Sequence, residues 1–450
     1  MKQILVIGAG QSAPYLIANL LENAEREDWF VTVGDLSQDQ ARERVGDHPR
    51  GTAVLFDVED SDLRAEYIKR ADVVVSMLPP TYQNLIAWDC VNHGRHMVSA
   101  SYREEEVRRL DLDSRRRGVL LLCEMGLDPG IDHMSAMSLI RRVHAEGGRI
   151  TAFRSYGAGL PSPHQPHNPL RYVITWNPRN VVMAGSGGAQ YMEDGRIKMV
   201  PYHEVFLHTW PVDVDGMGEL EAYPNRDSMS YMQTFGLEHV HTMIRGTMRY
   251  PGWSETWAQI VRLGLPNETL RIPNLADRSC REVVEMFLPL NISEGKIGQR
   301  IARFLHISPT GRIMKNLRWL GLLDSEPCGC EGNTSAAMLR DLLIEKLALG
   351  PDGKDVVVLV HELDVEYPGD GGREPQRITS TLVAESENPG FTAMSKAVGL
   401  PAAIAVKLIL RGELPLTGSF IPTHPAIYEP VLRELEENGL RFNEKTTPLL

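Results

Sequence analysis

Residues 3–13 join a short apolar run to a glycine-rich turn, QILVIGAGQSA. The apolar run predicts a buried β-strand, and the glycines after it form a GxGxxA pattern. Gly8 permits a tight turn, Gly10 lets the backbone approach a pyrophosphate, and Ala13 allows the next helix to pack closely on the strand. A helical pattern follows at 14–24. The segment therefore predicts the first unit of a dinucleotide-binding domain, with an ordinary glycine turn as the alternative.

The rest of the first 122 residues repeats this alternation of strand and helix. Strand-like runs lie at 3–9, 30–35, 52–57, 72–78, 96–100 and 118–123. Helical patterns lie between them, for example at 14–24 and 87–94. Nearly continuous Val, Ile and Leu runs separated by helices indicate a parallel sheet that is covered on both faces. Six such strands predict an α/β, Rossmann-type, doubly wound parallel sheet.

The pattern changes after about residue 150. Longer, more mixed strand signals lie at 149–157, 171–176, 354–367 and 377–387. The loops between them are rich in Pro, Gly, His and Asn, which predicts an α+β region with a mixed sheet. Residues 273–325 turn helical and predict a small insert, and 392–412 predict a helix that packs back on the first domain.

Composition excludes some classes of partner. The formal net charge of −12 disfavours binding to nucleic acid or to an anionic membrane, both of which need a basic face. No uninterrupted apolar run reaches the length of a membrane span, and the N-terminal run is too short for a signal peptide. We therefore expect a cytoplasmic protein without nucleic-acid or membrane partners.

The five cysteines are odd in number and scattered, which argues against a disulfide framework. Cys328 and Cys330 lie close together in EPCGCEG, but no second Cys or His pair with zinc spacing accompanies them. An ordinary loop is favoured over a metal or redox site, and we expect no metal site.

The second predicted strand ends at Asp35, 22 residues after Ala13. An acid there is placed to accept hydrogen bonds from the ribose hydroxyls and to repel a 2′-phosphate, so it predicts NAD over NADP. A helix N-cap is the alternative role for Asp35. The residues predicted to bind the cofactor, NAD or NADP, are Gly8, Gly10, Gln11, Ser12, Ala13, Asp35, Asp57, Ser76, Leu78 and Leu127.

The sixth predicted strand leads into CEMGLDPGIDHM, residues 123–134. A turn needs only Pro and Gly, whereas this one adds two carboxylates, Asp128 and Asp132, and then His133, beside the nicotinamide half of the cofactor. The position predicts an active-site wall. The alternative is that Asp128 caps the helix that begins near Pro129. Candidate acid or base groups are Asp128, Tyr102 and His133, none of them as a dedicated base.

The sequence resembles a known family, the saccharopine reductases, also called glutamate-forming saccharopine dehydrogenases. The likeness covers roughly residues 1–260 and 355–425. The segments that carry it are GLDPGIDHM (126–134), SASYREEE (99–106), SYGAGLPSPHQPHNPL (155–170), AYPNRDS (222–228), IRGTMRY (244–250) and the helix 392–412.

The resemblance implies three parts and one reaction. The parts are an NAD(P)-binding domain at 1–130, completed by about 392–450; a mixed-sheet α+β substrate-binding and dimerisation domain at 131–272 and 326–391; and a small helical domain at 273–325. The reaction is the reversible oxidation of saccharopine by NAD(P) to L-glutamate and 2-aminoadipate 6-semialdehyde, in a homodimer. The implied substrate contacts are Ser101, Tyr102, Asp128, Gly159, Leu160, Arg226, Asp227 and Ser228.

The proposed contacts suit the substrate, which carries three carboxylates and two amines. Arg226 can hold a carboxylate through two parallel hydrogen bonds, and Asp128 can pair with an ammonium group. An internal salt bridge with Asp227 or Asp213 is the alternative role for Arg226. Arg245 and Arg249 could bind a carboxylate in the same way, and an internal salt bridge is again the alternative for each.

Two departures from the family pattern keep alternatives open. Gly157 stands where the family commonly has Cys, so one side-chain contact is lost, and Asp35 stands where fungal members that use NADP have arginine-type chemistry. A related amine dehydrogenase, of the lysine 6-dehydrogenase or carboxynorspermidine synthase type, is the nearest rival. A protein that binds NAD without catalysis is the second.

Overall fold

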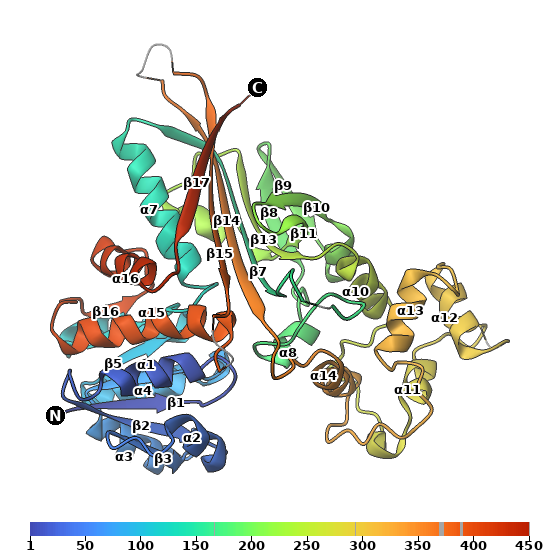
Figure 1. Ribbon diagram of the computed structural model, residues 1–450, viewed down its shortest axis with the longest axis horizontal. Helices are drawn as coiled ribbons and strands as arrows, with labels where there is room; N and C mark the ends of the chain where they lie inside the picture. The colour runs from blue at the N-terminus through green and yellow to red at the C-terminus, as the bar shows by residue number, and fades with distance from the viewer. Residues whose placement is uncertain (166, 293, 369–372, 388–389, 450) are drawn as a thin grey trace. The chain divides into compact units, whose positions relative to one another are not determined.

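The computed structural model describes residues 1–165, 167–292, 294–368, 373–387 and 390–449 (Figure 1). The chain forms two compact units. Unit 1 comprises Met1–Ile150 and Val365–Leu450, and unit 2 comprises Thr151–Asp364.

Unit 1 is built on a seven-stranded parallel sheet with the order β16-β6-β5-β4-β1-β2-β3. The strands are β1 (Lys2–Ile7), β2 (Trp29–Asp35), β3 (Gly51–Leu55), β4 (Val73–Ser76), β5 (His96–Ser99), β6 (Leu120–Leu122) and β16 (Gly418–Phe420). The order 3-2-1-4-5-6 within this sheet is that of the dinucleotide fold, so the predicted doubly wound sheet is confirmed. The sequence pattern did not predict β16, which extends the sheet beyond β6.

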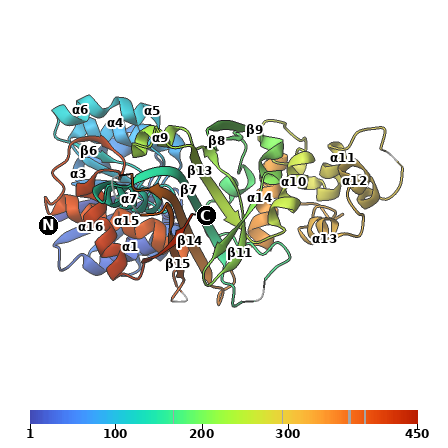
Figure 2. The same cartoon turned by 90° about the horizontal axis from the view of Figure 1, so that it is seen from above.

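Unit 1 also contains helices, most of which pack against the strands of this sheet (Figure 1). They are α1 (Pro14–Asn23), α2 (Gln38–Val45), α3 (Ser61–Arg70), α4 (Gln83–His93), α5 (Glu105–Arg109), α6 (Asp111–Arg116), α7 (Ile131–Ala145), α15 (Ala393–Leu410) and α16 (Pro425–Glu437), with the short 3₁₀ helix η1 (Pro80–Tyr82). Two further strands of unit 1, β15 (Gln376–Glu385) and β17 (Phe442–Pro448), pair with each other antiparallel. Figure 2 shows α7 beside α16, which it contacts.

The helix α15 packs against α1, far from it in sequence (Figure 1). A side chain at Gly399 would place its Cβ 2.8 Å from the main-chain nitrogen of Leu16, so the two helices approach closely at this glycine. Ser395 Oγ accepts a hydrogen bond from the Tyr15 N–H at 3.2 Å. Within the described residues, α15 is the one helix whose length and composition would suit a membrane span, yet 78% of it is buried, as in a core helix.

Unit 2 contains a mixed sheet, and this confirms the predicted fold class. Its main path is β10-β11-β13-β7-β14, with β8, β9 and β12 at the side. The strands are β7 (Arg149–Pro161), β8 (Ala189–Glu193), β9 (Arg196–Val200), β10 (Trp210–Val214), β11 (Gly218–Pro224), β12 (Arg226–Asp227), β13 (Thr242–Arg249) and β14 (Asp355–Glu366), and the unit boundaries fall within β7 and β14.

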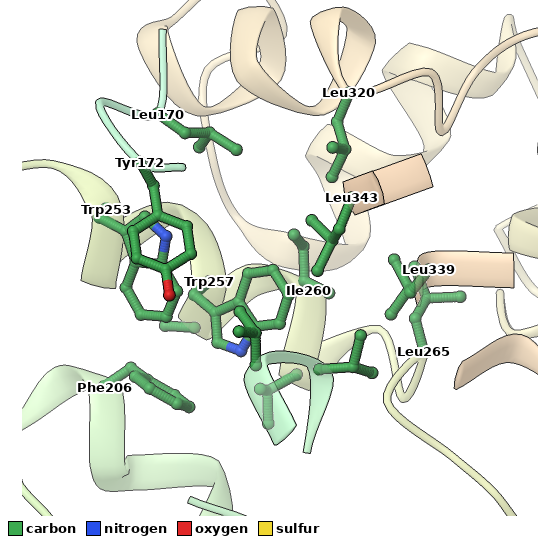
Figure 3. Packing of buried hydrophobic residues seen from close by; sticks show 14 of the residues in the cluster. Leu170, Tyr172, Phe206, Trp253, Trp257, Ile260, Leu265, Leu320, Leu339 and Leu343 are labelled. Atoms are coloured by element: carbon green, nitrogen blue, oxygen red, sulfur yellow. The ribbon is translucent and has the colours of Figure 1, made fainter. Parts of the chain in front are cut away.

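Most helices of unit 2 share one apolar core with the sheet. The helices are α8 (Pro178–Val182), α9 (Ser230–Phe235), α10 (Trp253–Arg262), α11 (Cys280–Met286), α12 (Ile297–Leu305), α13 (Arg312–Trp319) and α14 (Ser335–Lys346), with the 3₁₀ helices η2 (Tyr202–Leu207) and η3 (Leu275–Asp277). Figure 3 shows Trp253, Trp257, Tyr172 and Phe206 converging in this core. The indole rings of Trp253 and Trp257 stack with centroids 5.2 Å apart, and this aromatic column anchors α10.

The predicted strand at 171–176 is wrong. Apart from an isolated bridge between Ile174 and Ala348, these residues form a loop. The Asn168 side chain holds the loop by accepting from the Leu170 N–H at 3.1 Å and donating to the Tyr172 carbonyl at 2.6 Å. Such local side-chain hydrogen bonds compete with sheet formation, and they outweigh the strand-like composition here.

Candidate functional site

The glycine turn of unit 1 has the geometry of a phosphate cradle. Gly8 has φ +102°, a conformation that favours glycine, and its N–H donates to the Gly34 carbonyl at 2.8 Å. Asp35 accepts from the Ala9 N–H at 2.8 Å through one carboxylate oxygen and from the Ser37 N–H at 2.9 Å through the other. The second strand is thereby tied to the turn.

The residues around this turn fit a dinucleotide. A Cβ at Gly10 would meet nothing within 4 Å, so the backbone is open to a ligand there. The helix α1 then begins at Pro14, directly after this turn, so its partial positive end favours an anion bound there. Pro14 has no N–H and the Tyr15 N–H already donates to Ser395 Oγ, so this attraction comes from the helix dipole rather than from the first N–H groups. Gln11 is exposed and Ser12 half-buried at this turn, whereas Ala13 is buried against the sheet.

The other predicted cofactor residues lie at the ends of neighbouring strands. Asp57 is exposed two residues beyond β3, Ser76 is the buried last residue of β4, and Leu127 lies in the loop after β6. Leu78 lies beside the glycine turn, because a Cβ at Gly8 would fall 3.3 Å from its side chain. The structure thus brings these residues to the carboxyl edge of one sheet.

The GLDPGID segment after β6 folds back tightly on itself. Its ends approach so closely that a Cβ at Gly130, where φ is +149°, would lie 2.0 Å from the Gly126 carbonyl oxygen. The Gly126 N–H donates to the Pro129 carbonyl at 3.0 Å. The Gly130 N–H donates to an Asp132 carboxylate oxygen at 2.7 Å. Glycine is therefore required at position 130 by direct contact with backbone.

Two of the predicted catalytic residues meet at this loop. The Tyr102 hydroxyl donates to Asp128 Oδ1 at 3.3 Å, and both side chains are half-buried. Asp128 does not cap α7 with its side chain, since that helix begins at Ile131 without a side-chain cap. Ser101, next to Tyr102, donates through its hydroxyl to the Leu78 carbonyl at 2.9 Å. The loop after β5 therefore joins the cofactor edge to Asp128.

His133 has a different environment. Its ring is 0% exposed, with Nε2 2.8 Å from Glu124 Oε2 and Nδ1 2.9 Å from Asp132 Oδ2. Burial alone lowers the pKa of His133, but the two carboxylates outweigh burial and raise it to about 9. The ring is thus a buried imidazolium that presents neither nitrogen to a ligand. Sequence reasoning did not identify Glu124, whose positive φ of 63° only the structure reveals.

The raised pKa of His133 predicts a pH-dependent stability. A group whose folded pKa exceeds its unfolded value stabilises fully below the unfolded value, 6.5, and this contribution is lost as pH rises through about 9. At about 1.4 kcal/mol per pKa unit, the free energy of unfolding falls by about 3 kcal/mol over this range. Urea unfolding followed by tryptophan fluorescence at pH 6, 7.5 and 9 measures the loss. The His133→Gln variant should lack this fall, and equal slopes in both proteins would contradict the assignment.

The remaining predicted substrate residues lie in unit 2. Gly159 and Leu160 belong to β7, and the Leu160 side chain is fully buried in the core, so only its main chain is open to a polar contact. Arg226 lies on the short strand β12 with φ +55° and an exposed side chain. Asp227 accepts from the Met229 N–H at 2.7 Å. Ser228 Oγ accepts from the Arg245 N–H at 2.9 Å, which ties this turn to β13.

Sequence reasoning gave too little weight to Arg249, at the end of β13. Its side chain is 4% exposed, yet its guanidinium makes no ion pair among the described residues, and its Nε has no hydrogen-bond partner there. The group lies over the rings of Tyr172 and Trp253, at 4.7 and 5.2 Å from their centroids. Burial raises the pKa of Tyr223, and the positive charge of Arg249 opposes that rise.

A buried guanidinium without a carboxylate partner is costly. An incoming carboxylate would supply the missing partner of Arg249 and, with it, charge-assisted hydrogen bonds. The internal salt bridge considered as the alternative for Arg249 is absent from the described part of the chain. Only tertiary structure separates Arg249 from an arginine such as Arg154, which pairs with Asp364 at 3.0 Å.

Comparison with known proteins identifies two matching family regions. Residues 4–122 match the family described as "Saccharopine dehydrogenase NADP binding domain". Residues 126–440 match the family described as "Saccharopine dehydrogenase C-terminal domain". The boundary between the two matches falls directly before the GLDPGID loop.

Relatives extend this similarity over the whole chain. The "Saccharopine dehydrogenase [NADP(+), L-glutamate-forming]" of Saccharomyces cerevisiae is 30% identical over 457 residues, covering 99% of both chains. The "Alpha-aminoadipic semialdehyde synthase, mitochondrial" of Rattus norvegicus is 31% identical over 452 residues, covering 99% of this chain. That match covers 48% of the rat protein, so the chain spans about half the length of this type of relative.

A solved structure has the same fold. The apo saccharopine dehydrogenase (L-Glu forming) from Saccharomyces cerevisiae superimposes with a TM-score of 0.86 at 29% sequence identity. The match covers 99% of this chain and 100% of that one.

Proposed function

The chain belongs to the saccharopine dehydrogenase family, and from this premise we propose that it is an NAD(P)-dependent oxidoreductase acting on saccharopine. The products of the oxidation are L-glutamate and 2-aminoadipate 6-semialdehyde, and the reaction is reversible. The observation that carries the proposal is one within unit 1. The glycine turn before α1 and the loop with Asp128 both lie at the carboxyl edge of the same parallel sheet, where ligands of such sheets bind.

The chemistry divides between the cofactor and the protein. A dinucleotide held at the glycine turn would supply the hydride acceptor for the substrate carbon next to the secondary amine. The protein orients the substrate, keeps the reacting amine in place and provides for loss of its proton. Water then adds to the resulting C=N bond and releases the amine of glutamate and the aldehyde.

Asp128 is the proposed contact for the substrate amine. Its carboxylate holds an ammonium group by charge, and Tyr102, which donates to it, fixes its orientation. The proton acceptor is open between Asp128, Tyr102 and water. His133 is a poor candidate, because both of its nitrogens face carboxylates within the protein.

Carboxylate recognition is the proposed task of groups in unit 2. Arg226, Asp227 and Ser228, with the main chain at Gly159 and Leu160, are the contacts expected from the family motifs. We add Arg249, because its guanidinium is buried and has no carboxylate partner among the described residues. Two arginines suit a substrate with three carboxylates.

Replacing Asp128 with asparagine should raise the KM for saccharopine by about 10- to 100-fold, because a charge-assisted hydrogen bond to the amine becomes a neutral one. The KM for the dinucleotide should stay within about twofold, since uniform loss of substrate binding leaves the cofactor site intact. Initial rates at varied saccharopine measure both values. An unchanged kcat/KM in this variant would remove Asp128 from the site.

The cofactor is NAD or NADP, and Asp35 favours NAD through its negative charge. The names of the fungal relatives specify NADP(+) for those proteins. Asp35→Asn keeps an oxygen that can accept from the Ala9 or Ser37 N–H and removes the charge that a 2′-phosphate would meet. The ratio of kcat/KM for NADP to that for NAD should rise about tenfold. A ratio that does not change would show that Asp35 does not select the cofactor.

A comparison of two substrates, each supplied alone, tests the proposed function against its nearest rival, a lysine 6-dehydrogenase. The protein is incubated with NAD or NADP and either saccharopine or lysine, and glutamate is quantified by mass spectrometry. Glutamate formed from saccharopine supports the proposal, whereas cofactor reduction with lysine alone favours a lysine 6-dehydrogenase. A homodimeric assembly and a cytoplasmic location stay predictions.

A further inference from the structure

The buried ring of His133 connects two segments that carry proposed active-site residues. Glu124 follows β6, whereas Asp132 and His133 lie in the first turn of α7. The ring bridges a carboxylate from each, at 2.8 and 2.9 Å. A neutral imidazole carries one N–H and can donate to one carboxylate only. Because both nitrogens face carboxylate oxygens, the bridge requires the doubly protonated ring.

Each carboxylate holds a different loop. Glu124 accepts from the Arg103 N–H at 3.0 Å through its other oxygen, and its own N–H donates to the Ser101 carbonyl at 3.0 Å. Glu124 therefore forms hydrogen bonds with the residues on both sides of Tyr102, Ser101 and Arg103. The left-handed backbone at Glu124, with φ +63°, is held in place by these contacts.

Asp132 holds the other loop. Its second carboxylate oxygen accepts from the Gly130 N–H at 2.7 Å, and its own N–H donates to the Leu127 carbonyl at 3.1 Å. Asp128 lies between these two anchor points. The hydrogen bond from Tyr102 to Asp128 then closes a circuit that runs through both loops and returns to His133.

We propose that His133 is a positioning residue: by bridging Glu124 and Asp132, it fixes the loop that carries Ser101 and Tyr102 relative to the loop that carries Asp128. The inference deepens the proposed function and rests on it. Without the cation, two buried carboxylates would face an uncharged group, and the two loops would separate to let water reach them.

The charged and titratable groups near the ring come from several elements. Glu124 and Asp132 contact it, and Asp128 with Tyr102 lies on the linked loops. Cys123 precedes Glu124 and is fully buried, and burial raises the pKa of its thiol to about 12, so it stays neutral. The guanidinium of Arg103 donates to the Ser419 carbonyl at 2.8 Å. Among the residues that the structure describes, the His133 imidazolium is therefore the cation that contacts both carboxylates.

A charge-compensation experiment tests the proposal. His133→Gln should lower kcat/KM for saccharopine by about 100-fold at pH 8, mainly through KM, because the substrate contacts are misplaced. The loss should shrink towards pH 6, where uptake of a proton by the carboxylate pair replaces the missing positive charge. The double variant Glu124→Gln/His133→Gln removes one negative charge with the positive one. It should recover to within about tenfold of the wild type and lose the new pH dependence.

The outcomes separate the possibilities. Wild-type protein that does not oxidise saccharopine overturns the proposed function, on which this inference depends. Active wild type with an equally active His133→Gln variant overturns the positioning role alone. If the single variant does not fold, a folded and active double variant supports a role through charge. A double variant as impaired as the single variant, or also unfolded, shows that His133 acts by packing and overturns the proposal.

Discussion

Replacing Gly130 with alanine is expected to lower kcat/KM for saccharopine by at least about 100-fold, the scale of loss that a shift of about 1 Å in a catalytic loop produces. The new Cβ would lie 2.0 Å from the Gly126 carbonyl oxygen and 2.4 Å from the Gly126 nitrogen. Both are backbone atoms, so no side-chain rotation relieves the clash. The loop must open, and Asp128 moves with it. Steady-state kinetics and the thermal midpoint, Tm, measure the effect.

Gly147 supplies a matched control after the other end of the same helix, α7. It also has a positive φ, +77°, but a Cβ there would meet nothing within 4 Å. Gly147→Ala should therefore cost only the conformational strain, about 1 kcal/mol in stability, and should leave kcat/KM within about twofold of the wild type. If both variants lose activity equally, or if Gly130→Ala remains as active as Gly147→Ala, the loop does not position the substrate.

The second large effect is expected at Arg249. Arg249→Met should raise the KM for saccharopine by about 100-fold or more, because a buried carboxylate would lose its charged partner. Tm should stay constant or rise, since the change removes a buried, uncompensated charge and keeps apolar contact with Tyr172 and Trp253. A fall in affinity without a fall in stability is the signature of a ligand-binding arginine.

Arg154 provides the contrasting control in unit 2. Its guanidinium already pairs with Asp364 at 3.0 Å, with 20% of the side chain exposed. Arg154→Met should lower Tm, because the part-buried ion pair with Asp364 is lost, and should leave KM unchanged. Arg249→Met that behaves in this way, with reduced stability and unaltered KM, would identify Arg249 as a structural cation.

Much of unit 1 follows from local sequence. The run of Val, Ile and Leu before Gly8 predicts a strand buried on both faces, and the same pattern recurs in the five strands that follow along the chain. β16 was not predicted, because a strand of three residues, Gly418–Phe420, is too short to show a periodic pattern. Its pairing with β6 is a tertiary contact that joins distant parts of the sequence. The expected division into three domains stays a prediction.

The candidate site was predictable in part. The Pro and Gly residues of GLDPGID predicted an unusual turn. Because the segment follows a strand, it was also expected at the ligand-binding edge of the sheet. The burial of His133 had no such signal: Glu124 and Asp132 lie in the same stretch of sequence, but only the folding of the loop brings Glu124 to the ring. Arg249 shares the motif IRGTMRY with Arg245, and only packing shows that Arg249 lies buried without an ion pair in the described residues. The sequence gives the type of each residue but not the groups that its side chain contacts in the folded protein.

The most direct test is absorbance at 340 nm after purified protein is mixed with saccharopine and either NAD or NADP. We expect absorbance to rise with at least one dinucleotide, only when saccharopine is present, and glutamate to accumulate in equal amount. A faster rise with NAD would support the role given to Asp35, and a rise with NADP alone would reverse it while keeping the enzyme. No rise with either dinucleotide, from folded protein that binds the cofactor, would contradict the proposed function.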